Sequence, residues 1–118
     1  MQFLCLAYGA EADWKALSKT EQNVLLAHDE ALRAKGALMA AVEPSVSTVR
    51  AWEGQPTVTD GGISHLPVPL AGFSVIEAAD IEEAVRLVAD TPCARAKGAI
   101  EIRPILMIND DQWRGTGA

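Results

Sequence analysis

The chain has 118 residues, of which 49% are hydrophobic, and its net charge is −6 from 16 acidic and 10 basic residues. This length fits one domain with a real core, and an acidic chain without a Lys/Arg run is a poor partner for nucleic acid or an anionic membrane. The two cysteines favour a reducing compartment, and no apolar stretch reaches the ~18 residues of a membrane span. We therefore expect a soluble, cytoplasmic protein.

The first half of the chain predicts a strand, a helix and a second strand. QFLCLAY (2–8) is typical of a buried strand, and the AEADWKAL segment after it is expected to be a loop. A helix is predicted from about 19 to 35, because Ser18 and Glu21 have the spacing of a capping box and Gly36 suits the left-handed position after the last turn. ALMAAV (37–42) is predicted as the next strand.

A hairpin and a second strand–helix–strand unit follow. VSTVRAWE (46–53) has strand composition, and PTVTD (56–60) returns as its partner after a tight turn. LAGFSVIEA (70–78) is predicted as a strand, and Asp80 caps a helix with an apolar stripe at Ile81, Ala84, Val85 and Val88. The Asp90-Thr-Pro92 segment ends this helix, with Cys93 in a loop. The last strand lies within residues 99–108, and 109–118 form a polar tail.

This order, β-α-β-β-β-α-β, predicts an α+β domain over residues 1–108: a ferredoxin-like split βαβ arrangement with an inserted hairpin. Two helices can cover only one face of a sheet of four or five strands. We expect a homodimer in which the bare sheet faces meet in C2 symmetry and form a dimeric α+β barrel with clefts.

One stretch, VTDGGISHLPVPLAGFSVIEA (58–78), resembles the signature of the YCII-related family in its DGPF branch. The match includes Asp60 and Gly61, the Gly72-Phe73 strand and the IEAAD ending, and the similarity extends over roughly residues 1 to 105. The resemblance implies a dimeric α+β barrel. It also implies an acid–base pair between a histidine of the first helix, whose position is Leu25 here, and an aspartate that Asp90 matches.

Three residues are candidates for proton transfer. Asp60 either only ends a strand before a glycine turn or projects into a cleft. His65, in a proline-rich loop, is by default a surface histidine, although imidazole titrates near neutral pH. His28 is expected on the inward helix face with Val24, Leu25, Ala31 and Leu32, either as a bonded core histidine or as a shifted version of the family's histidine.

Tyr8, Glu43 and Arg103 are candidate ligand-binding residues at strand ends or polar strand faces. Arg103 alternates with Ile100 and Ile102, so it should face away from the helices. There it pairs with Glu101, Glu77 or an anionic ligand, and an ion pair between subunits is one interpretation. The sequence contains no metal-ligand spacing and no nucleotide-binding motif, and no cofactor is implied.

Whether the chain is an enzyme stays open at this point. One hypothesis is an acid–base enzyme with a small-molecule cleft, in which Asp60 and a histidine move a proton. The alternative is a ligand-binding or regulatory module without catalysis. The resemblance supports the alternative too, because genes of the DGPF branch often lie beside those of alternative sigma factors. A third hypothesis is a purely structural dimer.

Overall fold

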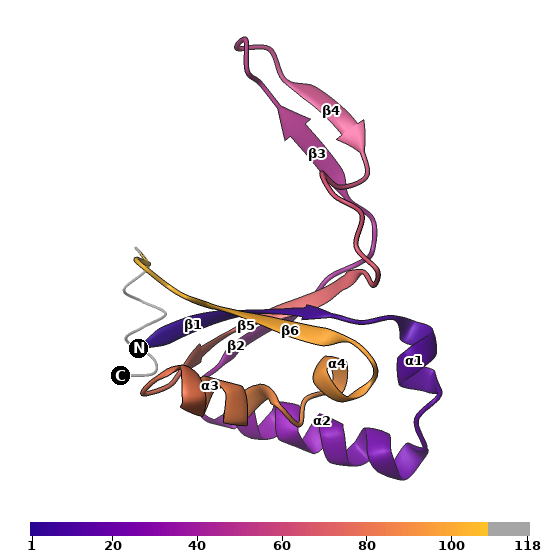
Figure 1. The fold of residues 1–118 in the computed structure, drawn as a ribbon, viewed down its shortest axis with the longest axis vertical. Helices are drawn as coiled ribbons and strands as arrows, with labels where there is room; N and C mark the ends of the chain where they lie inside the picture. The colour runs from indigo at the N-terminus through magenta and orange to yellow at the C-terminus, as the bar shows by residue number, and fades with distance from the viewer. Residues whose placement is uncertain (109–118) are drawn as a thin grey trace.

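The computed structural model describes residues 1–108 and places four strands in a main sheet (Figure 1). In chain order the elements are β1 (Gln2–Tyr8), α1 (Glu11–Lys15), α2 (Lys19–Ala34), β2 (Leu38–Ala41), β3 (Ser47–Arg50), β4 (Thr57–Asp60), β5 (Leu70–Glu77), α3 (Ile81–Val88), α4 (Pro92–Arg95) and β6 (Ala99–Pro104). The predicted tail, 109–118, lies outside the described residues.

The main sheet has the strand order β2–β5–β1–β6, and all of its neighbouring strands are antiparallel. Two units, β1–α2–β2 and β5–α3–β6, are interleaved so that β1 and β5 lie side by side in the centre. This is the split βαβ topology. The α+β, ferredoxin-like prediction is therefore confirmed.

The two longer helices begin where their capping residues predict. Ser18 Oγ accepts from the Glu21 amide at 3.1 Å, while the Ser18 amide donates to Glu21 Oε1 at 2.9 Å, which completes the capping box. Gly36 follows α2 with a φ of 97°, a conformation that glycine adopts without strain. The Asp80 carboxylate caps α3 by accepting from the Glu83 amide at 2.8 Å.

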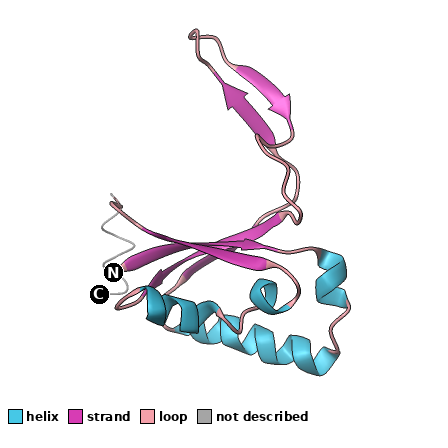
Figure 2. Cartoon of the chain, in the orientation of Figure 1, coloured by secondary structure: helices cyan, strands magenta, loops and turns pink. Residues whose placement is uncertain are grey.

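All four helices lie on the same side of the main sheet (Figure 2). The buried core lies between these layers and consists of Phe3, Cys5, Ile76, Ala78, Ala84 and Val88, with Ile100 and Ile102 packed against it. The strand register puts Leu4, Leu6, Phe73 and Val75 together on the opposite face, which no helix of residues 1–108 covers. We call this surface the open face of the sheet.

Strands β3 and β4 form a separate two-stranded sheet rather than extending the main one. Residues 42–69, here called the arm, carry this hairpin away from the main sheet on the side opposite the helices (Figure 1). Asp60 ends β4, and Gly61 follows in the left-handed region with a φ of 97°. The PTVTDGGISHLP stretch therefore contains the strand end and turn that its composition predicts.

Three local predictions were wrong. The expected loop after β1 contains the short helix α1, and the expected loop around Cys93 contains α4. In α3, Ala84 and Val88 are buried but Ile81 and Val85 are exposed, so the inward face is narrower than the predicted stripe.

Within residues 1–108, no helix has the length and apolar character to cross a membrane.

Candidate functional site

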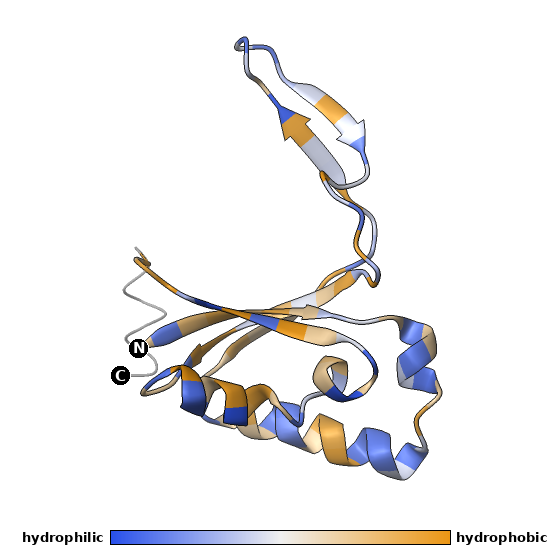
Figure 3. Cartoon of the chain, in the orientation of Figure 1, coloured by the Kyte–Doolittle hydropathy of each residue, from blue (hydrophilic) through white to orange (hydrophobic). Residues whose placement is uncertain are grey.

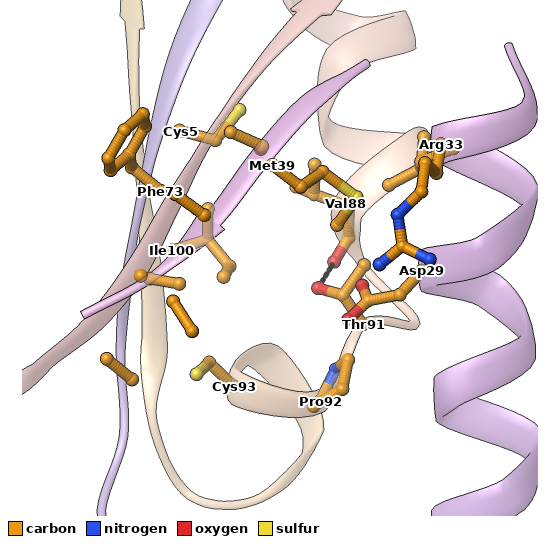
Figure 4. A pocket seen from close by; sticks show the side chains of 17 residues that line it. Cys5, Asp29, Arg33, Met39, Phe73, Val88, Thr91, Pro92, Cys93 and Ile100 are labelled. Carbon is orange, nitrogen blue, oxygen red and sulfur yellow. Dashed lines mark hydrogen bonds between the residues drawn. The ribbon is translucent and has the colours of Figure 1, made fainter. Parts of the chain in front are cut away.

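A cavity of about 250 Å³ lies between α2, the segment from α3 to α4, and the helix-facing side of the main sheet. We call it the helix–sheet cavity. Figure 4 shows Asp29 and Arg33 reaching it from α2, and Thr91, Pro92 and Cys93 from the segment opposite. The sheet supplies mostly small or apolar groups, among them Cys5, Ala7, Met39, Gly72, Ser74 and Ile100. The cavity is thus an apolar space with a few polar groups at one side, as ligand sites commonly are.

Asp29 reaches the cavity because of the rotation of α2 on the sheet. The least exposed positions of this helix are Gln22, Leu25, Asp29 and Leu32, which recur at intervals of three and four residues. Such spacing defines one face of a helix. Leu25 and Leu32 are buried on this face, and Asp29 lies between them as its one charged member, half-buried at the cavity wall.

Burial raises the pKa of the Asp29 carboxyl group above its usual range, and the charges of Arg33 and His28 only partly oppose this effect. The reason is that desolvation disfavours the charged form of a carboxyl group. Within residues 1–108 the carboxylate has no hydrogen bond or ion pair that would hold it ionised. Ionisation of this carboxyl group is therefore less favourable in the folded protein than in water.

The other polar groups discussed at the cavity either form hydrogen bonds or ion pairs or have a raised pKa that keeps them protonated. Burial, and then the charge of Asp29, raises the pKa of the Cys93 thiol, so this thiol stays protonated at neutral pH. Burial likewise raises the pKa of Cys5. The Thr91 hydroxyl donates to the Val88 carbonyl, and the Arg33 guanidinium pairs with Glu30. Asp29 is thus the cavity group best suited to proton transfer.

A second cavity, of about 330 Å³, lies at the root of the arm. Its wall is formed by α1 and by both ends of the arm, and includes Trp14, Val42, Pro44, Pro69 and Leu70. Pro92 and Cys93 also line the helix–sheet cavity, so the two cavities are neighbours separated by the start of α4.

The predicted ligand-binding residues Tyr8 and Arg103 lie together on the open face. Tyr8 Oη donates to Glu101 Oε1 at 2.7 Å, and this hydrogen bond is the main cause of the raised pKa of Tyr8. Arg103 follows Glu101 by two residues in β6 and pairs in register with Leu4, which confirms that it faces away from the helices. Among residues 1–108, no carboxylate forms an ion pair with Arg103, and Glu77 instead binds the N-terminal ammonium at 2.6 Å.

The three predicted proton-transfer residues are not brought together within one chain. Asp60 ends β4 and His65 follows it in the arm, whereas His28 belongs to α2 on the other side of the sheet (Figure 1). All three are exposed, and none of them lines either cavity. Glu43 is also exposed, in the segment after β2.

The expectation that His28 lies on the inward face of α2 was wrong. The predicted stripe and the observed one share Leu25 and Leu32, but the helix is rotated so that Asp29 replaces His28. Asp90, which matches the family's aspartate, binds the side chain of Arg95 through a 2.9 Å contact to Nε. Leu25, at the family's histidine position, is buried.

Sequence reasoning missed Asp29, although a signal was present. Asp29 stands four residues after Leu25 and three before Leu32, which is the spacing of a single helix face. A charged residue between two apolar residues at this spacing is a candidate for a functional group, because charged residues are rarely buried without a reason.

Together, the topology and the cavity define an α+β protein of the ferredoxin-like type with a sheltered space between its helices and its sheet. The chain belongs to the YCII-related family, because the model of the YCII-related domain matches residues 1–109. The predicted family membership is confirmed. A comparison with curated proteins found no match.

Among solved structures, the chain is similar to a 5-chloro-2-hydroxyhydroquinone dehydrochlorinase from Burkholderia phenoliruptrix, solved as a complex with 2,5-dihydroxybenzoquinone. The identity is 18% and the TM-score is 0.46, over 89% of this chain and 93% of that one.

Proposed function

We propose that this protein binds a small organic molecule in the helix–sheet cavity and that Asp29 transfers a proton to or from it. The observation that carries this proposal is a half-buried carboxyl group with a raised pKa at the wall of an apolar cavity. Acid–base catalysis is most effective when the pKa of the catalytic group approaches the working pH. The proposal keeps the predicted chemistry of an acid–base enzyme but gives it to a different residue.

The cavity also limits what the ligand can be. At about 250 Å³, the cavity lies just below the ~300–1,000 Å³ of typical ligand pockets, so its ligand should be small. The lining is mostly apolar, and its one cation, Arg33, is already paired with Glu30. These features favour a small uncharged molecule, with a carbonyl or hydroxyl group that Asp29 can reach.

We further propose that the protein is a homodimer that closes the open face. Leu4, Leu6 and Phe73 are partly exposed on this face, and a second subunit would remove their apolar surface from water. Tyr8, Glu101 and Arg103 lie on the same face, so a dimer would surround them with protein. The roles predicted for Tyr8, Glu43 and Arg103 in ligand binding, and for Asp60, His65 and His28 in catalysis, stay predictions.

The test is a screen followed by a proton-exchange measurement. Neutral cyclic ketones and phenols of the size given above are screened by thermal shift, because a ligand that binds only the folded protein stabilises it. Compounds that bind are checked for shifts of the Asp29, Thr91 and Cys93 amide signals by NMR. Exchange of their acidic C–H protons is then followed in D₂O with the wild-type protein and with Asp29→Asn.

We expect Asp29→Asn to bind these compounds but to lower the exchange rate by about 10²- to 10⁴-fold, the usual contribution of one acid–base group. Glu82→Gln, which removes an exposed carboxylate of α3 that does not line the cavity, is the control and should exchange at the wild-type rate. Equal rates for the wild type and Asp29→Asn would contradict the catalytic proposal. Binding without exchange in either protein would favour the alternative, a non-catalytic or regulatory module such as one working with a sigma factor.

A further inference from the structure

The arm is an ordered element that exposes an unusual amount of apolar surface. Among residues 1–108, seven of the fifteen exposed large hydrophobic side chains belong to residues 42–69. The most exposed are Trp52 at 88%, Ile63 at 80%, Val58 at 68% and Val49 at 62%. Figure 3 shows an apolar segment on each strand of the hairpin. Exposed apolar patches of this kind mark interaction sites.

Hydrogen bonds close the hairpin at both ends, so its shape is set within the arm itself. The Gly61 amide donates to the Val46 carbonyl at 2.8 Å, and the Thr48 hydroxyl donates to the Gly61 carbonyl at 2.6 Å. Near the tip, the Gly54 amide donates to the Ala51 carbonyl at 3.0 Å. A lone two-stranded hairpin is nevertheless only marginally stable in water, and packing against another surface is what usually stabilises it.

The register puts both valines of the hairpin on one face and only polar residues on the other. Val49 pairs with Val58, and these two side chains share a face with Ser47 and Asp60. The opposite face carries the Thr48–Thr59 and Arg50–Thr57 pairs. Such alternation is typical of a sheet with one face packed on protein and the other in water. Within this chain, however, the arm stands away from the main sheet (Figure 1).

We propose that the valine face of the arm packs on a second copy of this chain, so that each subunit of the dimer grips the other with its arm. The inference rests on the homodimer of the proposed function and extends it. Its first support is direction: the arm rises on the open-face side of the sheet, which is the side the partner would occupy (Figure 1).

The second support is area. Four strands averaging about six residues cover on the order of 400 Å², whereas each partner in a stable interface usually buries ~800 Å². The open face alone falls short of this, and the arm offers further apolar surface on the same side. The chain's radius of gyration is 16.1 Å, against ~13.5 Å for a compact domain of this length. A subunit shaped in this way leaves room for its partner between sheet and arm.

In this arrangement Asp60 would lie against the partner subunit. Because Asp60 shares the valine face, the arm carries its carboxylate to the surface of the partner subunit rather than to its own cavities. Any role of Asp60 would then be exerted between subunits.

Two measurements on the full-length protein test the arm. In the first, Val49→Thr/Val58→Thr is compared with wild type by sedimentation, since threonine keeps the shape and strand preference of valine but adds a hydroxyl group. The dimer dissociation constant should rise about tenfold or more, because four valines in the dimer lose an apolar contact. Thr59→Val, on the opposite face, is the control and should leave the dissociation constant unchanged.

In the second measurement, the photocrosslinker p-benzoylphenylalanine is placed at position 49 or at position 59. Irradiation should give a covalent dimer from position 49 and none from position 59. A wild-type dimer whose dissociation constant does not respond to the valine substitutions, or crosslinks from position 49 that stay within one chain, would overturn the role of the arm while leaving the dimer intact. A wild-type monomer at high concentration would instead refute the dimer itself.

Discussion

At the scale of single residues, the site depends on which side of α2 faces the sheet. His28 and Asp29 are neighbours in sequence, but only Asp29 lies at the cavity wall, between the buried Leu25 and Leu32. The apolar pattern of α2 also fits a helix turned slightly the other way, toward Val24 and Ala31. The two orientations share both leucines, so the sequence pattern alone did not distinguish them.

A pH-dependent stability effect follows from Asp29. Its pKa is raised in the folded state, so ionisation costs stability. The cost is fully present above the folded-state pKa, and it vanishes as the pH falls below the unfolded value of about 3.9. We expect Asp29→Asn to have a higher Tm than wild type at pH 7.

The difference in Tm between Asp29→Asn and wild type should disappear near pH 3.5. Thermal unfolding of the two proteins between pH 3.5 and 8 measures the effect. Glu82→Gln, which removes an exposed carboxylate of α3, serves as the control. A variant that is less stable than wild type at pH 7, or a difference that grows on acidification, would show that Asp29 is stabilised as a carboxylate.

At the scale of elements, helix ends and strands follow local rules that the sequence displays. Ser18 and Glu21 form the predicted capping box, and the strands lie within a few residues of their predicted bounds. Helices α1 and α4 were missed because five and four residues are too few to show a helical period. α4 matters for the site, since it presents Pro92 and Cys93 to both cavities.

The turn between α4 and β6 should tolerate no side chain at Gly98. A Cβ atom there would lie 2.0 Å from the Tyr8 carbonyl oxygen and 2.7 Å from that of Cys93, both backbone atoms. Gly98→Ala should therefore lower the free energy of unfolding by about 1–3 kcal/mol or more, as overpacking does, and shift the amide signals of Tyr8 and Cys93. Urea denaturation and NMR measure the two effects.

Gly62→Ala is the matched control for this substitution. The added Cβ atom would lie 3.6 Å from the nearest atom, the Ser64 carbonyl oxygen, which is an ordinary contact distance. Its stability should stay within about 0.5 kcal/mol of wild type. Equal effects of the two substitutions would mean that the close approach at Gly98 does not constrain the turn.

At the scale of the whole molecule, two surfaces with apolar side chains have no packing partner among residues 1–108: the open face and the valine face of the arm. Leu6 lies near the middle of the open face, opposite Phe73 in β5 and Glu101 in β6. A lysine at this position would bring a further charge beside Glu101 into the proposed interface between the two sheets, where removing charged groups from water costs free energy.

We therefore expect Leu6→Lys to sediment as a monomer at concentrations where the wild type is a dimer, a rise of about a hundredfold or more in the dissociation constant. Leu26→Lys is the control, because Leu26 is exposed to solvent on α2, in the helix layer and away from the open face. This variant should remain a dimer. If Leu6→Lys associates as tightly as wild type, the open face is not the interface.

The order of elements, the helix caps and the direction of Arg103 could all be predicted from the sequence. Each depends on a local pattern, such as the alternation of Ile100, Glu101, Ile102 and Arg103 along one strand. The exposure of His28, the position of Asp29 at a cavity and the separation of the arm from the main sheet required the folded structure. They depend on contacts between segments distant in the chain, where a small rotation of one helix changes which of two adjacent polar residues faces the sheet.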